Sequence, residues 1–164
     1  EHNGEAVFAI IALGLCQAAY FSEDLRSGLR SVSAGQMEAA KAWSIWEAST
    51  SKLFFDQSLI DHFGSPHTAL SLARIEAHYF VNNAFYDTDN YLIENVDKIR
   101  HIPAVIVQGR YDVVCPMMSA WDLHRAWPEA DFKVIPDAGH SATEKGTIAA
   151  LVDATDRFRN TGAG

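Results

Sequence analysis

Two kinds of hydrophobic patterning follow one another along the chain. Up to about residue 100, apolar residues recur every three or four positions, which is the period of a helix that buries one face. Beyond it, two short runs of β-branched residues stand between turn residues, and each predicts a buried strand. We therefore expect helices over 37–49, 68–81 and 91–99, a stretch over 53–60 that either continues the first helix or forms its own, a break over 63–67, strands over 104–108 and 132–135, and helices over 117–127 and 147–158.

The second part of the chain reads strand, helix, strand, helix. This order predicts two parallel strands joined by a right-handed crossover, and hence an α/β fold. A parallel sheet of two strands leaves a face and an edge uncovered, whereas such sheets are ordinarily buried on both faces. We expect an incomplete parallel sheet whose further strands come from outside this chain.

Each predicted strand ends in a loop that carries one glycine and one polar residue of a catalytic type. Residues 104–112 read AVIVQGRYD, and residues 132–140 read FKVIPDAGH. Functional groups of open α/β sheets lie in loops at the carboxyl ends of the strands, so Asp112 and His140 are expected to meet there. A histidine that acts as a base needs a carboxylate to fix its tautomer. An Asp followed by a His is the second half of the Ser, Asp, His order of α/β-hydrolases. The alternative is that Asp112 is a turn residue and His140 a surface residue, without a role in catalysis.

The first half of such a triad is missing from the sequence. The 164 residues contain no G-x-S-x-G nucleophile elbow and no H-G-G-type oxyanion loop. The nearest match is SVSAG at 31–35, but an elbow needs a buried strand before it, and residues 23–30 are charged. Ser33 is instead expected to cap a helix, with Gln36 completing a capping box. We expect this chain alone to be inactive.

Composition limits the class of protein. An apolar share of 48% is ample for the core of one domain, and 13 basic against 21 acidic residues give a net charge of −8. An acidic chain is a poor partner for nucleic acid, whose phosphates need a basic face. Two cysteines make no disulfide framework, which favours a reducing, cytoplasmic location. No metal is expected, because ligand spacing is absent around His62, His67, His101 and His124.

The apolar run over 6–20 raises the question of a membrane segment. It is shorter than the about 20 apolar residues that a spanning helix needs. The residues before it are acidic, whereas the start of a secretory signal is basic. We expect a buried helix here and no membrane association. The sequence does not begin with Met, which fits a fragment, a processed product or a trimmed chain.

Five segments of the chain resemble one family. They read AAKAWSIWE at 39–47, ARIEAHYF at 73–80, HIPAVIVQGRYDVVCP at 101–116, LHRAWP at 123–128 and DAGHS at 137–141. Together they closely resemble the proline iminopeptidases (prolyl aminopeptidases), a branch of the α/β-hydrolase serine peptidases. The resemblance runs from about residue 39 to residue 159, and residues 1–33 match poorly.

The resemblance implies a fold and an activity. The fold would be the C-terminal part of an α/β-hydrolase, with residues 34–100 as an all-helical cap domain and residues 101–164 as the C-terminal part of the catalytic domain. The activity would be that of a serine aminopeptidase that releases N-terminal proline from peptides, without a metal or another cofactor. In that reaction Asp112 would be the triad acid and His140 the triad base.

The resemblance also implies how the substrate's free amine is bound. Glu47 and Glu76 match cap carboxylates that hold this amine in the family. A buried carboxylate makes charge-assisted hydrogen bonds to a terminal ammonium, and an internal peptide bond offers no such charge. From the residues alone, the favoured interpretation of each glutamate is a solvated helix face or an ion pair with Lys41 or Arg74, and the resemblance shifts the expectation to amine binding.

Three further residues are candidates for a pocket that receives the proline ring. Tyr79 and Phe80 stand on the helix that carries Glu76, although aromatic residues in such a place are as often core. Cys115 lies three residues after Asp112 and would sit close to the site. It is not expected to act as a nucleophile, because nothing in the sequence supplies the activating environment that a reactive thiol needs.

Two alternatives remain open. The chain could be a non-catalytic, truncated copy that binds peptides, associates with itself or joins a missing N-terminal half through its exposed sheet edge. It could also belong to a different α/β-hydrolase, such as an esterase or epoxide hydrolase, that shares the Asp and His loops. The matches within the expected cap argue against the second alternative.

Overall fold

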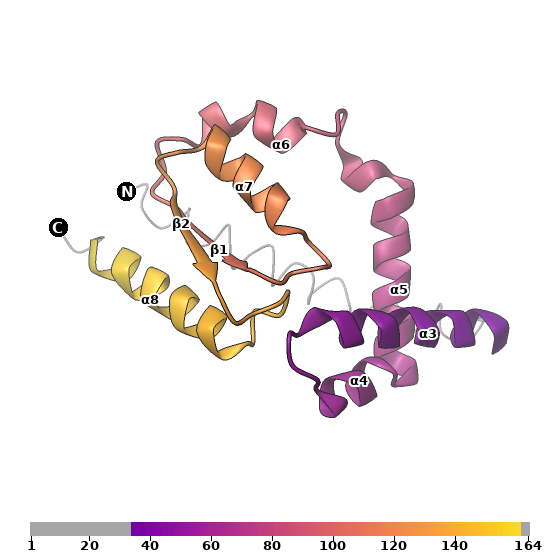
Figure 1. The fold of residues 1–164 in the computed structure, drawn as a ribbon. Helices are drawn as coiled ribbons and strands as arrows, with labels where there is room; N and C mark the ends of the chain where they lie inside the picture. Colours follow the sequence, from indigo (N-terminus) through magenta and orange to yellow (C-terminus); the bar gives the residue numbers. More distant parts are fainter. Residues whose placement is uncertain (1–33, 162–164) are drawn as a thin grey trace.

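Helices form one end of the molecule, and a small sheet flanked by two helices forms the other (Figure 1). The computed structural model describes residues 34–161. The buried helix expected over 6–20 and the helix cap expected at Ser33 therefore lie outside the described residues. No helix within residues 34–161 is long and apolar enough to cross a membrane.

Helix α3 (Ala34–Ser51) packs across helix α5 (Pro66–Val81) through small side chains. The buried residues of α3 recur every fourth position and form one stripe, which consists of Ala40, Ser44 and Ala48. Ser44 Oγ donates a hydrogen bond to the carbonyl of Ala69 in α5 at 3.3 Å. Small residues on both sides of the contact let the two helices approach closely. This packing fixes the two helices that carry Glu47 and Glu76.

Helix α4 (Gln57–Phe63) is separate from α3, which answers the question left open for residues 53–60. Asp56 caps its start by accepting a hydrogen bond from the Leu59 N–H at 3.0 Å, and Lys52 pairs with the same carboxylate at 2.6 Å. The Lys52 contact, followed by those of Ser58 and Leu59, holds the pKa of Asp56 well below its usual range. The break expected over 63–67 is shorter than predicted, because Pro66 opens α5 at its first turn.

The single helix expected over 91–99 is wrong in its extent. The chain forms a short helix α6 (Tyr91–Glu94) and a 3₁₀ turn η3 (Val96–Lys98) with Asn95 between them. Asn95 leaves the helical conformation, and its side-chain amide donates to the Tyr91 carbonyl at 2.7 Å. A short polar side chain that bonds the nearby backbone competes with continuation of the helix. A further 3₁₀ turn, η2 (Asn83–Phe85), follows α5 with positive φ at all three residues.

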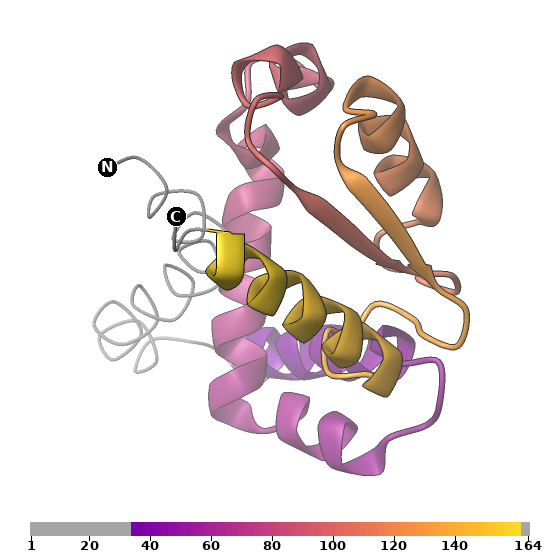
Figure 2. The same ribbon diagram turned by 90° about the vertical axis from the view of Figure 1, so that its left-hand side faces the viewer.

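The two predicted strands pair in parallel, as the strand and helix order indicated. β1 (Val105–Gly109) and β2 (Asp131–Ile135) align so that Gly109 lies opposite Ile135 and both strands end level. Helices α7 (Met117–Ala126) and α8 (Lys145–Thr161) lie on opposite sides of the strands (Figures 1 and 2). Parallel strands carry their following loops on the same edge, so the loops after β1 and β2 meet. Within the described residues the sheet has these two strands, so it is the small, incomplete parallel sheet that the sequence predicted.

A small core fixes where β1 begins. It is formed by Val96, Trp127 and Ala130, against which Ala104, Ile106, Leu123 and Ala126 pack. Trp127 Nε1 donates to the Arg100 carbonyl at 3.3 Å, and the Arg100 guanidinium donates to the Ala126 carbonyl at 2.7 Å. The segment that leads into the sheet is thus held against the end of α7.

Candidate active site

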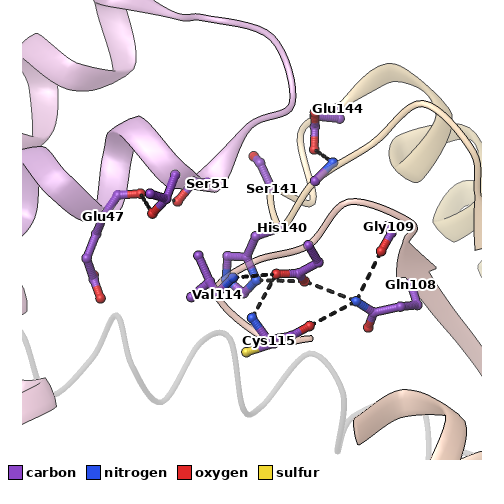
Figure 3. Close-up of polar contacts among 12 residues, drawn as sticks. Glu47, Ser51, Gln108, Gly109, Val114, Cys115, His140, Ser141 and Glu144 are labelled. Carbon is purple, nitrogen blue, oxygen red and sulfur yellow. Dashed lines mark hydrogen bonds and ion pairs between the residues drawn. The ribbon is translucent and has the colours of Figure 1, made fainter. Parts of the chain in front are cut away.

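Asp112 and His140, from the loops after β1 and β2, form a direct hydrogen bond (Figure 3). His140 Nδ1 lies 3.0 Å from Asp112 Oδ2. The Asp112 side chain is 6% exposed, whereas that of His140 is 39% exposed. Because a carboxylate can only accept, Nδ1 carries the hydrogen, and Nε2 of the neutral ring is left as an acceptor. The arrangement is that of a buried orienting acid and an accessible base.

The Asp112 carboxylate is held by four donors. Oδ1 accepts from the backbone N–H groups of Val114 at 3.0 Å and Cys115 at 2.7 Å. Oδ2 accepts from Gln108 Nε2 at 3.1 Å in addition to His140. Gln108 also donates to the Cys115 carbonyl at 3.1 Å, which closes the loop around the carboxylate (Figure 3). Gln108 was not singled out from the sequence, where it reads as one more residue of the buried strand.

Gly109 allows the two loops to come this close. A Cβ atom built on Gly109 would lie 1.8 Å from the carbonyl oxygen of Gly139 and 2.8 Å from that of Ala138. Two backbone hydrogen bonds cross the same contact. The Arg110 N–H donates to the Ile135 carbonyl at 2.9 Å, and the Tyr111 N–H donates to the Ala138 carbonyl at 3.0 Å. No side chain fits there without separating the loops that carry Asp112 and His140.

The loop of His140 is also held from the helical part of the molecule. The Ser51 carbonyl, at the end of α3, accepts from the backbone N–H groups of His140 at 2.8 Å and Ser141 at 2.7 Å. The Glu144 carboxylate accepts from the Gly139 N–H at 2.7 Å and from the Leu53 N–H at 2.9 Å. Sequence reasoning missed both Ser51 and Glu144, since no pattern shows which distant amide a given acceptor will meet.

Glu47 and Glu76 come together as a carboxyl pair between α3 and α5. Burial, then a hydrogen bond with the Glu76 carboxyl and its charge, raise the pKa of Glu47 to about 7. Glu76 Oε2 accepts from Trp43 Nε1 at 2.6 Å, a partner that sequence reasoning also missed. Lys41, one of the ion-pair partners considered for these residues, lies instead 3.5 Å from Glu38. Two carboxyl groups that share a site form a natural receptor for a cation.

Cys115 lies in the loop of Asp112, where the charges of Asp112 and Glu47 act on its thiol. Burial, the charge of Asp112 and the charge of Glu47 raise the pKa of the Cys115 thiol, in that order of size. A thiol held in its neutral form is a poor nucleophile, in line with the expectation from the sequence. The electrostatic effect of Glu47 on Cys115 means that this carboxyl of the pair lies near the loop that carries Asp112.

Two grooves lie on the helical part. The larger, of about 780 Å³, runs between α3 and α5 and includes Trp43, Glu76 and Phe80 in its lining. The smaller, of about 360 Å³, includes Tyr79 and Phe80. Phe80 therefore shares a groove with Glu76 and is 64% exposed, whereas Cys115 lines neither groove. Within residues 34–161 no group of three or more His, Cys, Asp or Glu side chains is arranged to hold a metal ion.

Comparison with known proteins gives a family and several relatives. The family model of the alpha/beta hydrolase fold matches residues 5–147. A Leptolyngbya boryana protein named "Probable proline iminopeptidase" is 60% identical over 120 residues, which are 73% of this chain and 37% of that protein. Proteins named proline iminopeptidase from Xylella fastidiosa (strain 9a5c) and Arabidopsis thaliana are 54% and 53% identical over 76% of this chain, and the matches cover 40% and 33% of those proteins. The chain thus spans between a third and two fifths of the length of these curated relatives.

Gly109→Ala tests the close contact of the two loops. The added methyl would collide with the Gly139 carbonyl, so we expect the His140–Asp112 hydrogen bond to be lost and the free energy of unfolding to fall by about 3 kcal/mol or more. The downfield proton resonance of His140 Nδ1 and denaturant unfolding measure the two effects. Gly35→Ala is the matched control, because its Cβ meets nothing within 4 Å and alanine is the better helix former. A Gly109→Ala chain that kept both the resonance and its stability would contradict this account.

Proposed function

This chain belongs to the α/β-hydrolase fold family, and on that premise we propose that it carries the acid, the base and the amine-binding carboxylates of a proline iminopeptidase. The observation that carries the proposal is the Asp112–His140 hydrogen bond, in whose loop Cys115 feels the charge of Glu47 from the carboxyl pair. An enzyme that removes one N-terminal residue needs both a charge to bind the ammonium and a base to activate a nucleophile.

In the proposed reaction, His140 is the general base and then the general acid. Asp112 holds the imidazole so that Nε2 takes the proton of a serine hydroxyl as this oxygen attacks the carbonyl carbon of the N-terminal proline. His140 then gives that proton to the departing amine. In the second half of the reaction, His140 takes a proton from water, the water oxygen attacks the acyl-enzyme, and proline is released as the serine hydroxyl is protonated again. The serine and the oxyanion hole are proposed to come from polypeptide outside these 164 residues, since the sequence holds neither motif.

In the same proposal, residues 34–100 form the cap domain that selects the substrate. Glu47 and Glu76 hold the secondary ammonium of an N-terminal proline by charge-assisted hydrogen bonds. Trp43 holds Glu76 in place for that contact. Tyr79, Phe80 and Cys115 are proposed to line the pocket of the proline ring, with Phe80 and Glu76 sharing one groove in support. The proposed substrates are peptides with N-terminal proline, and the proposed location is the cytoplasm.

A second candidate is a non-catalytic copy that associates with another chain. Two features favour it: sheet edges that no other strand of residues 34–161 pairs with, and exposed apolar residues such as Phe54, Phe55 and Phe80. The missing N-terminal half and a second copy of the chain are the partners that this candidate names. An esterase or epoxide hydrolase has no use for a carboxyl pair beside its base, which makes that alternative the weaker one.

A chimera tests the proposed reaction. The segment aligned over 120 residues replaces its counterpart in the Leptolyngbya boryana relative, and release of nitroaniline from proline p-nitroanilide is measured beside the unmodified relative. We expect activity from the chimera, and a loss of kcat of about a thousandfold or more for Asp112→Asn and for His140→Ala, because the base is then mis-oriented or absent. His101→Ala, an exposed histidine near the opposite end of β1, is the matched control.

Near-normal turnover by either of the first two variants would contradict the assignment of acid and base. The 164-residue chain by itself is expected to release nothing. Release by this chain that Ser33→Ala abolishes would contradict the interpretation of Ser33 as a helix cap, and would make that serine the nucleophile.

Glu47→Gln in the chimera tests amine recognition through pH. Burial and the Glu76 carboxyl raise the pKa of Glu47 to about 7, so this group is protonated below that pH. A bound ammonium favours the ionised form, and binding must therefore release this proton. We expect KM to fall by up to about tenfold per unit as the pH rises toward 7, and to level off above it.

In the Glu47→Gln variant we expect a raised KM with no such slope between about pH 5.5 and about pH 7.5, where the substrate amine stays charged. Glu38→Gln is the control, because this exposed carboxyl on the same helix pairs with Lys41. If Glu47→Gln keeps the normal pH profile of KM, Glu47 does not bind the amine.

A further inference from the structure

The carbonyl at the end of α3 is satisfied by the loop of the candidate base. The last carbonyls of a helix have no partner within it and need donors from elsewhere. Ser51, the last residue of α3, finds two such donors in the N–H groups of His140 at 2.8 Å and Ser141 at 2.7 Å. The backbone that carries His140 is thus fixed to a helix end that is distant in the sequence.

Glu144 closes the same contact from the other side. One carboxylate oxygen accepts from the Gly139 N–H at 2.7 Å, and the other accepts from the Leu53 N–H at 2.9 Å. Gly139 precedes His140, and Leu53 follows the end of α3, so one side chain spans both segments. A Cβ atom on Gly139 would lie 3.0 Å from the Leu53 nitrogen and 3.2 Å from the Ser51 carbonyl oxygen, which shows how closely the segments pack.

The last turn of α3 also carries one carboxyl of the amine site. Ser51 Oγ donates to the Glu47 carbonyl at 2.8 Å, one helical turn earlier. One helical turn therefore connects Glu47 to Ser51, and the two backbone hydrogen bonds to the Ser51 carbonyl connect this turn to the loop of His140.

We propose that Glu144 is a positioning residue: with the Ser51 carbonyl it clamps the His140 loop to the last turn of α3, so that the amine site and the base keep a fixed separation. The role assigned to Glu47 in this inference rests on the proposed function. An exopeptidase cleaves at one fixed distance from the terminal amine, and a rigid link between the two groups sets that distance.

NMR of the 164-residue chain tests the clamp. In Glu144→Gln, one acceptor oxygen becomes an NH₂ group that faces a backbone N–H, so one of the two hydrogen bonds is lost. We expect amide exchange to speed up by about tenfold or more at Gly139, His140 and Ser141, because the loop then opens locally. The downfield His140 Nδ1 proton resonance is expected to broaden or disappear, while amides of Val107 and Val134 in the sheet exchange as before.

Glu144→Asp is the second variant, since it keeps the charge but is too short to reach both amides. Smaller changes of the same kind are expected for it. Glu94→Gln is the matched control, because this exposed carboxylate accepts from Thr88 Oγ1 and touches neither loop. If the His140 proton resonance and the Ser141 exchange rate stay normal in Glu144→Gln, Glu144 does not position His140. Should Glu144→Gln not fold, the same two measurements on Glu144→Asp decide.

The two proposals fail in different experiments. The NMR measurement contains no proline chemistry, so it decides the clamp whatever the substrate is. Absence of proline release from the chimera would contradict the proposed function, whereas an unchanged His140 signal in the Glu144 variants would contradict the clamp. In an active chimera, Glu144→Gln is expected to lower kcat by about tenfold or more while KM stays within about twofold, because the residue acts through the base.

Discussion

The site depends on one close contact, in which the carbonyl of Gly139 occupies the space where a side chain of residue 109 would lie. Two parallel strands that end level bring their loops to the same edge, but they do not by themselves bring Asp112 within 3.0 Å of His140. Glycine at position 109 brings the two residues together, because it has no side chain and the second loop can pass directly over it. The two cross-loop backbone hydrogen bonds and the four donors around the Asp112 carboxylate then fix the result.

The helical part is tied to this contact and does not merely lie beside it. The end of α3 holds the backbone of His140, and Glu144 holds the residues on either side of that junction. Glu47, one carboxyl of the pair, stands one turn back along the same helix, and its charge helps to raise the pKa of the Cys115 thiol. Under the proposed function, a charge receptor and a base are thus built on one continuous structure, as selection of a chain terminus requires.

Parts of this arrangement could be predicted from the sequence because they depend on local pattern. Short β-branched runs, each followed by a loop with a glycine, predicted the strands and placed Asp112 and His140 at the same edge of the sheet. The helix over 91–99 could not be predicted correctly, since the Asn95 side chain competes for a backbone carbonyl within an otherwise helical pattern. Trp43, Gln108 and Glu144 escaped notice for a different reason. Each acts through a partner that only the folded chain brings near, and hydrophobic periodicity carries no record of such pairs.

The central claim is that this chain joins ammonium recognition to acid and base catalysis, and the dependence of the rate on a free substrate amine tests it most directly. The measurement compares kcat/KM of the chimera for proline p-nitroanilide and for the N-acetylated form of the same anilide. Acetylation removes the charge that the carboxyl pair binds and leaves the scissile bond unchanged, so the account predicts a rate lower by about a thousandfold or more for the acetylated substrate. Equal rates for the two anilides would contradict the account, because they would mean that Glu47 and Glu76 do not select the substrate.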